Sequence, residues 1–178
     1  IAESLMEAAM ECGSDPDQAW ALSGETEVEK LHAFRHAAAE TANLYIEEQR
    51  RNDDRITKLG TDMVIGEQTF KDLLEQYEED MNQAGLEDCI FGHALENHLH
   101  VNILPEDYEA YEKGIELIRN WAERTRALHG VLSGEHGVGK LKRQILGACV
   151  PEDYQELCRK LKAHLDIEGR LNQGNILG

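Results

Sequence analysis

The chain has 178 residues, enough for one domain with a substantial core and too few for two ordinary domains. Its hydrophobic content of 41% is typical of a globular protein, and no apolar stretch approaches the ~18 residues needed to cross a bilayer. The net charge of -17 serves solubility and would repel a phosphate backbone or an anionic lipid surface, so we expect no nucleic-acid or membrane partner.

The four cysteines are Cys12, Cys89, Cys149 and Cys158, and none forms a CxxC pair. A zinc ribbon or an iron–sulfur cluster within this segment is therefore not expected. Scattered thiols without a secretory signal indicate a reducing, cytoplasmic location. The first residues carry neither an initiator methionine nor the pattern of a signal peptide, so we expect a segment of a longer polypeptide.

In chain order, the hydrophobic pattern first predicts a short strand at 19–24, a long helix, a polar loop at 52–58 and a strand at 63–65. The apolar stripe of the long helix recurs at three- and four-residue steps, at Val28, Leu31, Phe34, Ala38, Ala42 and Tyr45. A second helix begins with a capping pattern at Thr69 and Asp72 and ends at Gly85. Its buried face is expected to comprise Phe70, Leu73, Leu74, Tyr77 and Met81.

The second half of the chain predicts two strands, 89–93 and 98–104, joined by a turn. A helix follows Pro105, then a loop at 130–139 with four glycines and a short helix at 140–146. Pro151 opens a last amphipathic helix, whose apolar positions are Tyr154, Leu157, Leu161 and Leu165. Mixed helices and short strands with a hairpin predict an α+β domain, with a mainly antiparallel sheet covered by helices in a ferredoxin-like arrangement.

The segment at 91–105, FGHALENHLHVNILP, carries the first candidate site. Alternation along a strand gives one apolar face and one polar face, and the polar face carries His98, His100 and Asn102. The hairpin can bring His93 close to His100, and two imidazoles on adjacent strands are a common basis for a divalent-metal site. An ordinary solvated face is the alternative, because the spacing of the two histidines does not decide between them.

The segment at 133–140, SGEHGVGK, carries the second candidate site. Glu135 and His136 lie between glycines, where the backbone can approach a ligand closely. Glu135 is the candidate third metal ligand, and a neutral His136 beside it is a candidate general base. A glycine-rich surface turn is the alternative. A phosphate loop is disfavoured, because Leu141 stands where Ser or Thr would hold magnesium and Glu135 would oppose the phosphates.

Both segments together resemble the C-terminal domain of FAD-linked oxidases in the vanillyl-alcohol-oxidase superfamily, which includes D-lactate, glycolate and D-2-hydroxyglutarate dehydrogenases. The family pattern GHxGDGNLHxN corresponds to residues 92–102, and SGEHGxGxxK corresponds to 133–142. The closing pattern LDPxxxLNPGKIL corresponds to 165–177, and LWxxR corresponds to Leu31–Arg35. The order of the motifs agrees, and the resemblance covers most of the chain.

The resemblance implies that His93, His100 and Glu135 bind a divalent metal, for which zinc, manganese and iron(II) all qualify. It implies that His136 is the catalytic base, that Asn102 contacts the substrate and that Arg35 pairs with the substrate carboxylate. Further implied contacts are Lys58 with an anion, His98 in the substrate pocket, where the family pattern has Asn, and Asn172 near the flavin.

The implied activity is that of an FAD-dependent dehydrogenase that oxidises a small 2-hydroxy acid to a 2-oxo acid. FAD would be held mainly by an N-terminal domain that this sequence does not contain, so activity is expected only in the full-length protein. A self-contained metal-dependent hydrolase is one alternative, and it predicts activity without flavin. A non-catalytic interaction module with a decayed site is another, and it predicts no tight metal binding. A domain that lacks its flavin partner should also expose apolar residues, which favour a partner domain or a homo-oligomer.

Overall fold

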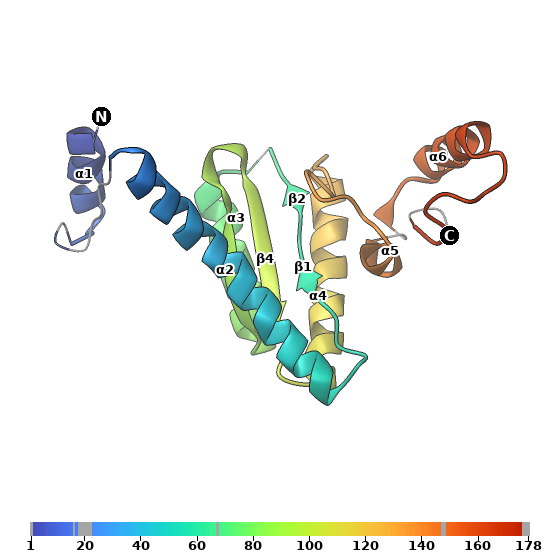
Figure 1. The fold of residues 1–178 in the computed structure, drawn as a ribbon, viewed down its shortest axis with the longest axis horizontal. Helices are drawn as coiled ribbons and strands as arrows, with labels where there is room; N and C mark the ends of the chain where they lie inside the picture. Colours follow the sequence, from blue (N-terminus) through green and yellow to red (C-terminus); the bar gives the residue numbers. More distant parts are fainter. Residues whose placement is uncertain (1, 16, 18–22, 67, 147–148, 176–178) are drawn as a thin grey trace. The chain divides into compact units, whose positions relative to one another are not determined.

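The computed structural model describes residues 2–15, 17, 23–66, 68–146 and 149–175 (Figure 1). Contacts between residues divide the chain into two units, 1–41 and 42–178, and the boundary lies within helix α2 (Glu25–Asn52). The first unit also contains helix α1 (Ala2–Glu11). Most of the strand predicted at 19–24 lies outside the described residues. None of the described helices has both the length and the apolar composition that crossing a membrane requires.

The second unit contains a four-stranded antiparallel sheet. Its strands are β1 (Leu59–Gly60), β2 (Met63–Val64), β3 (Glu87–His93) and β4 (His98–Leu104). β4 is central, with β3 on one side and the short strands β1 and β2 sharing the other side. The helices of this unit are α3 (Phe70–Ala84), α4 (Tyr108–Ala127), α5 (Leu141–Leu146) and α6 (Glu152–Leu165). This arrangement confirms the predicted α+β class with an antiparallel sheet.

Local sequence signals set the ends of these elements. The Thr69 side chain accepts a hydrogen bond from the Asp72 amide at the start of α3, and Gly85 ends the helix with φ 65° in the left-handed region. Both ends of this helix were predicted from the sequence. The turn between β3 and β4 is a single 3-10 turn, Ala94–Glu96, followed by Asn97 with φ 49°. Asparagine tolerates that conformation, so the hairpin closes in the predicted place.

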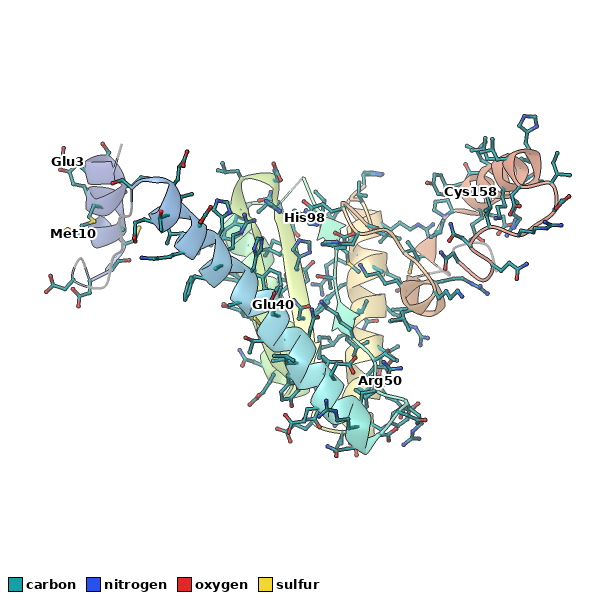
Figure 2. The ribbon with its side chains drawn as sticks, in the orientation of Figure 1. Glu3, Met10, Glu40, Arg50, His98 and Cys158 are labelled. Atoms are coloured by element: carbon teal, nitrogen blue, oxygen red, sulfur yellow. The ribbon has the colours of Figure 1, made fainter. Side chains whose placement is uncertain are left out.

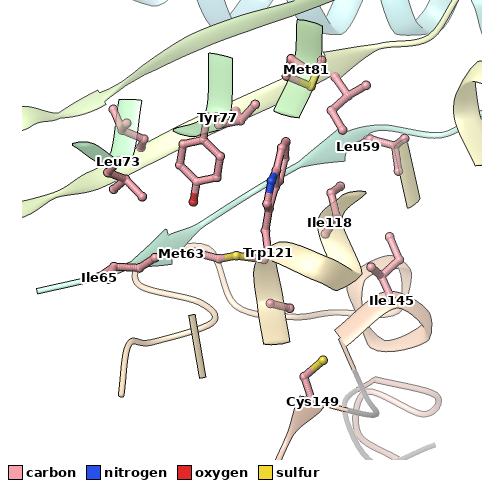
Figure 3. Close-up of a cluster of buried hydrophobic side chains, with 14 of the residues drawn as sticks. Leu59, Met63, Ile65, Leu73, Tyr77, Met81, Ile118, Trp121, Ile145 and Cys149 are labelled. Carbon is pink, nitrogen blue, oxygen red and sulfur yellow. The ribbon is translucent and has the colours of Figure 1, made fainter. Parts of the chain in front are cut away.

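The core lies against one face of the sheet. Alternate residues of β4 (Leu99, Val101 and Ile103) pack with side chains of α3 and α4 in one apolar cluster. Figure 3 shows Tyr77 of α3 beside Trp121 of α4, and their rings meet edge to face with centroids 4.8 Å apart. Full burial of such side chains contributes roughly 1.5–3 kcal/mol each. Because this face is filled, the opposite face of β4 carries the polar residues His98, His100 and Asn102.

The apolar stripe predicted along α2 is only partly buried. The helix forms as predicted, but Val28 and Phe34 are 41% and 66% exposed. Burial begins at Ala42, and Ile46 is the other buried position of this helix. Periodicity indicates that a helix is amphipathic, but it does not show whether an element of the same chain covers the apolar side.

Gly114 of α4 lies where the helix touches the sheet, so we expect Gly114→Ala to destabilise the protein. A Cβ there would lie 2.7 Å from Leu59 Cδ1 and 3.2 Å from Ile103 Cγ2, and both partners are fully buried. Overpacking costs about 1–3 kcal/mol, whereas alanine gains only ~1 kcal/mol over glycine within a helix. Urea unfolding should therefore show a net loss of stability, of up to about 2 kcal/mol. The matched control is Gly66→Ala, since a Cβ at Gly66 meets nothing within 4 Å. Equal stability of the two variants would contradict the packing.

Candidate metal centre

The edge of the sheet beside β4 is interrupted between β1 and β2 without a change of register. Its pairs are Leu59 with Ile103, Gly60 with Asn102, Met63 with Leu99 and Val64 with His98. At the interruption the Thr61 hydroxyl accepts from the Val101 amide and donates to the Leu99 carbonyl. The Thr61 carbonyl oxygen is thereby released from the ladder, and it lies 3.3 Å from Nδ1 of His100. The break in the strand thus turns a backbone acceptor toward the histidine face.

The histidine face of β4 is buried, so the ordinary solvated face considered as an alternative is wrong. His98 is 3% exposed, His100 is 8% exposed and Asn102 is 4% exposed. The hairpin sets His93 opposite His98, while His100 lies two residues further along β4. Figure 2 labels His98, the first residue of β4. Buried polar side chains require partners: His98 bonds to the Asp62 carboxylate, whereas His100 and Asn102 bond to backbone carbonyl groups.

The carboxylate of Glu135, on the glycine loop, is surrounded by four imidazoles. Its Oε1 lies 3.2 Å from Nε2 of His93 and 3.8 Å from Nδ1 of His98. Its Oε2 lies 3.8 Å from Nε2 of His100 and 3.7 Å from Nε2 of His136. His93, His100 and Glu135 each offer a ligand atom within 4.8 Å of the others. Ligands at about 2.0–2.2 Å from a tetrahedral ion lie ~3.4 Å from one another, so this spacing suits a divalent cation.

A second set of possible ligands, Asp62, His100 and His136, lies within the same 4.8 Å limit. Asp62 is 1% exposed, and its carboxylate already has four hydrogen-bond donors. These donors are Ser133 Oγ at 2.6 Å, the His136 amide at 2.8 Å, His98 Nε2 at 2.9 Å and the Glu135 amide at 3.2 Å. A carboxylate offers about four lone-pair sites, so Asp62 has none left for a cation. The set of His93, His100 and Glu135 is therefore the better candidate.

The hydrogen bond to Thr61 fixes the form of His100 that a metal site needs. A carbonyl oxygen only accepts, so Nδ1 of His100 carries the proton and Nε2 presents its lone pair on the side of Glu135. Burial lowers the pKa of His100, and the neighbouring imidazoles of His98 and His136 lower it further. His100 is thus neutral at neutral pH, which is the state that binds a metal.

Asp62 stays ionised at unusually low pH. Burial raises its pKa, but the hydrogen bonds from Ser133, from the amides of His136 and Glu135 and from His98 outweigh burial and lower the pKa to about 2. A carboxyl with this shift stabilises the fold fully above its ordinary pKa of 3.8, and this stabilisation is lost as the pH falls through 2.

We therefore expect the difference in stability between wild type and Asp62→Asn to depend on pH. The ionised carboxylate should contribute about 2 kcal/mol at neutral pH, and about half of this should be lost by pH 3. Urea unfolding of both proteins from pH 6 to pH 3 measures the difference directly. A difference that stays constant over this range would show that the pKa of Asp62 is not lowered.

Three other residues with roles implied by the resemblance, Arg35, Asn102 and Asn172, lie in different parts of the chain. Arg35 is exposed on α2 in the first unit, whereas the histidine cluster belongs to the second unit. The Asn102 amide donates at 3.3 Å to the Cys89 carbonyl within the sheet. Asn172 is exposed in the C-terminal segment, with φ 46°.

Lys58 lies at the edge of the sheet, where its Nζ donates to Asn43 Oδ1 at 2.8 Å. Loss of hydration lowers its pKa. Lys58 also lines a pocket together with Asp62 and Lys142. Burial lowers the pKa of Lys142 as well, so two lysines with depressed pKa values line this pocket.

Three residues of the site, Asp62, Thr61 and Ser133, were not predicted from the sequence. Asp62 and Thr61 fall between the predicted loop at 52–58 and the predicted strand at 63–65, and Ser133 was noted only as part of a motif. The one signal for Asp62 is a carboxylate immediately before an apolar strand. A single charge in that place does not indicate which distant loop it will hold.

The fold and the cluster together define a class of domain. Helices cover one face of its antiparallel sheet, the other face carries imidazoles, and a glycine loop brings a carboxylate against them. The chain belongs to the family described as FAD linked oxidases, C-terminal domain, which it matches over residues 2–176. The family resemblance drawn from the motifs is thereby confirmed.

Known proteins of this family include dehydrogenases of 2-hydroxy acids. The D-lactate dehydrogenase [cytochrome], mitochondrial, of Kluyveromyces lactis is 34% identical over 65% of this chain and 20% of its own length. The D-lactate dehydrogenase of Archaeoglobus fulgidus is 35% identical over 52% of this chain and 20% of its own. The D-2-hydroxyglutarate dehydrogenase, mitochondrial, of Bos taurus is 34% identical over 49% of this chain and 16% of its own. The chain thus spans between 15% and 24% of the length of these and the other curated relatives that it matches.

Proposed function

We propose that this chain is the substrate- and metal-binding part of a flavin-dependent dehydrogenase that oxidises a 2-hydroxy acid to a 2-oxo acid. The observation that carries the proposal is that ligand atoms of His93, His100 and Glu135 lie within 4.8 Å of one another, with His136 beside them. Membership of the FAD-linked oxidase family supports the flavin, and the names of the relatives support the class of substrate. The activity belongs to the full-length protein.

The residues present fit a divalent metal, and His93, His100 and Glu135 would hold it. Two imidazoles and a carboxylate suit zinc, manganese or iron(II). When bound, such an ion lowers the pKa of a hydroxyl group placed against it. The ion would also supply local positive charge for an anionic substrate, whose approach the net charge of -17 otherwise opposes.

His136 would remove the proton of the 2-hydroxyl group. Its side chain is 61% exposed, so a substrate can reach it, and its Nε2 lies 3.7 Å from Glu135 Oε2 at the edge of the ligand set. Flavin, when bound, supplies the acceptor for the hydride that leaves carbon 2. Loss of that hydride and of the hydroxyl proton converts the 2-hydroxy acid into the 2-oxo acid, with His136 holding the proton.

The carboxylate of the substrate needs cationic or hydrogen-bonding partners from this chain. Arg35 can provide a bidentate contact through its guanidinium group, and Lys58 can provide a further contact through its ammonium group. His98 and Asn102 would shape the pocket from β4, and Asn172 would approach the flavin. The roles of Arg35, Asn102 and Asn172 rest on the match between family motifs and this sequence. His98 replaces the Asn of the family pattern at its position, and Lys58 is supported by its depressed pKa beside a pocket.

The exposed apolar side of α6 supports a partner domain. Four residues at helical spacing are between 52% and 76% exposed, namely Tyr154, Leu157, Leu161 and Leu165, and none of the residues of α6 is buried. A continuous exposed apolar stripe of this kind is typical of a surface that packs against another domain or protein. We propose that it packs against the N-terminal FAD-binding domain of the longer protein. A self-contained hydrolase has no use for such a stripe.

The test is anaerobic reduction of the flavin in the full-length protein. D-lactate, glycolate and D-2-hydroxyglutarate are mixed with it separately, and the flavin absorbance is followed. At least one of them should bleach the flavin, more slowly after treatment with a chelator and normally again after addition of zinc or manganese. The proposal fails if dithionite reduces the flavin while no 2-hydroxy acid does. Metal-dependent turnover without flavin would instead favour a hydrolase.

A further inference from the structure

We infer that Asp62 is a positioning residue, whose buried carboxylate holds the glycine loop so that Glu135 and His136 face the histidine strand. The inference rests on the proposed function where it treats Glu135 as a metal ligand and His136 as a base. Asp62 itself touches neither metal nor substrate in this account.

Every residue from 133 to 136 is hydrogen-bonded to Asp62. The hydroxyl of Ser133 and the amides of Glu135 and His136 donate to its carboxylate, at 2.6, 3.2 and 2.8 Å. The amide of Gly134 donates to its backbone carbonyl at 2.8 Å. One residue therefore fixes four consecutive residues of a loop that has no regular secondary structure of its own. The loop position depends on a charge, since carboxylate bonds are stronger than those to a neutral acceptor.

The loop is also pressed against the edge of the sheet. Val131 and Val64 exchange two backbone hydrogen bonds of 2.9 Å, so the start of the loop pairs with β2 through an antiparallel bridge. A Cβ on Gly134 would lie 2.9 Å from Val64 Cγ2 and 3.0 Å from His98 Cε1, so only glycine allows this approach. Because the backbone is this close to the sheet, the side chain of Glu135 reaches the imidazoles of the hairpin.

Asp62 is also hydrogen-bonded to His98 of β4. His98 Nε2 lies 2.9 Å from Asp62 Oδ1 and therefore carries the proton, while its Nδ1 lies 3.8 Å from Glu135 Oε1. Asp62 thus contacts both segments that supply the candidate ligands. Lys142 lies 4.0 Å from the other carboxylate oxygen and partly balances its charge. Removal of a residue that orients metal ligands without touching the metal typically weakens metal binding by about 10–100-fold.

The first readout is zinc affinity, measured by competition with a chromophoric chelator in the intact protein. Asp62→Asn should bind zinc about 10–100-fold more weakly. The asparagine NH2 group would face the hydrogen-bond donors of the loop and could not accept from them, so the loop would lose its anchor. The matched control is Asp80→Asn. Asp80 also accepts hydrogen bonds, from Trp121 Nε1 at 2.7 Å and Arg124 Nη1 at 3.1 Å, but it supports the core between α3 and α4. This control should lower stability and leave zinc affinity unchanged.

The second readout is amide hydrogen exchange of residues 134–136 in the metal-free protein, which does not depend on metal binding. Exchange there should be faster in Asp62→Asn than in wild type or Asp80→Asn. If wild type binds no zinc but exchange still accelerates, Asp62 holds the loop and the proposed metal role fails instead. Unchanged exchange, or unchanged affinity in a protein that does bind zinc, overturns the inference. Should Asp62→Asn not fold, Ser133→Ala takes its place, with a several-fold effect expected on both readouts and the same criteria.

Discussion

Glu135→Gln is expected to lower the affinity of the intact protein for zinc by more than about 100-fold. Loss of a residue that only supports a metal ligand already lowers metal affinity by about 10–100-fold, and Glu135 is a candidate ligand itself. Glutamine keeps the size of the side chain but removes the negative charge. The carboxylate it replaces lies 3.2–3.8 Å from four imidazole nitrogens, and the nearby Asp62 carboxylate is already occupied by hydrogen-bond donors.

The matched control for that variant is Glu96→Gln. Glu96 lies in the turn of the same hairpin, with Oε2 4.0 Å from His93 Nδ1, and its side chain is 70% exposed. The Glu96→Gln substitution removes one negative charge near the site, as Glu135→Gln does, but it removes no candidate ligand. Zinc affinity should therefore stay within a few-fold of wild type. Equal affinities for the two variants would mean that Glu135 is not a ligand.

His136→Gln is expected to slow flavin reduction by a 2-hydroxy acid by about 10²–10⁴-fold, the usual contribution of a general base. Metal content should remain, because His136 lies outside the set formed by His93, His100 and Glu135. Rapid-mixing kinetics of the full-length protein measures the rate, and elemental analysis of the same samples measures the metal.

The exposed His164 of α6 provides a control, as His164→Gln changes an imidazole that has no part in the cluster. An unchanged rate in His136→Gln would place the base elsewhere. Loss of metal together with the rate would favour the other ligand set, Asp62, His100 and His136, and would contradict the assignment made here.

The hairpin and α3 were predictable because their signals are local. Alternation along 98–104 separates an apolar face from a histidine face, and a hairpin of this length has few ways to close. Thr69 and Gly85 mark the ends of α3 by the bonds and backbone angles that their side chains favour. The meeting of the two motifs was expected from the family resemblance, and spacing alone did not require it.

Features that depend on contacts distant in sequence were not predictable in the same way. Asp62 binds a loop more than seventy residues away, at an interruption in a strand that the hydrophobic pattern does not reveal. The burial of His98 and His100 depends on what covers the sheet, and a period of two does not distinguish a buried polar face from a solvated one. The stripes of α2 and α6 show the converse, since strong helical periodicity there accompanies exposed apolar residues.

A divalent ion is expected to bind between β3, β4 and the glycine loop. Anomalous diffraction from crystals of the intact protein soaked in manganese or zinc tests it most directly. We predict a single strong peak bounded by Nε2 of His93, Nε2 of His100 and the carboxylate of Glu135, absent from crystals of His100→Ala. A peak against Asp62 and His136 instead, or no peak at this face of the sheet after soaking, would contradict the account.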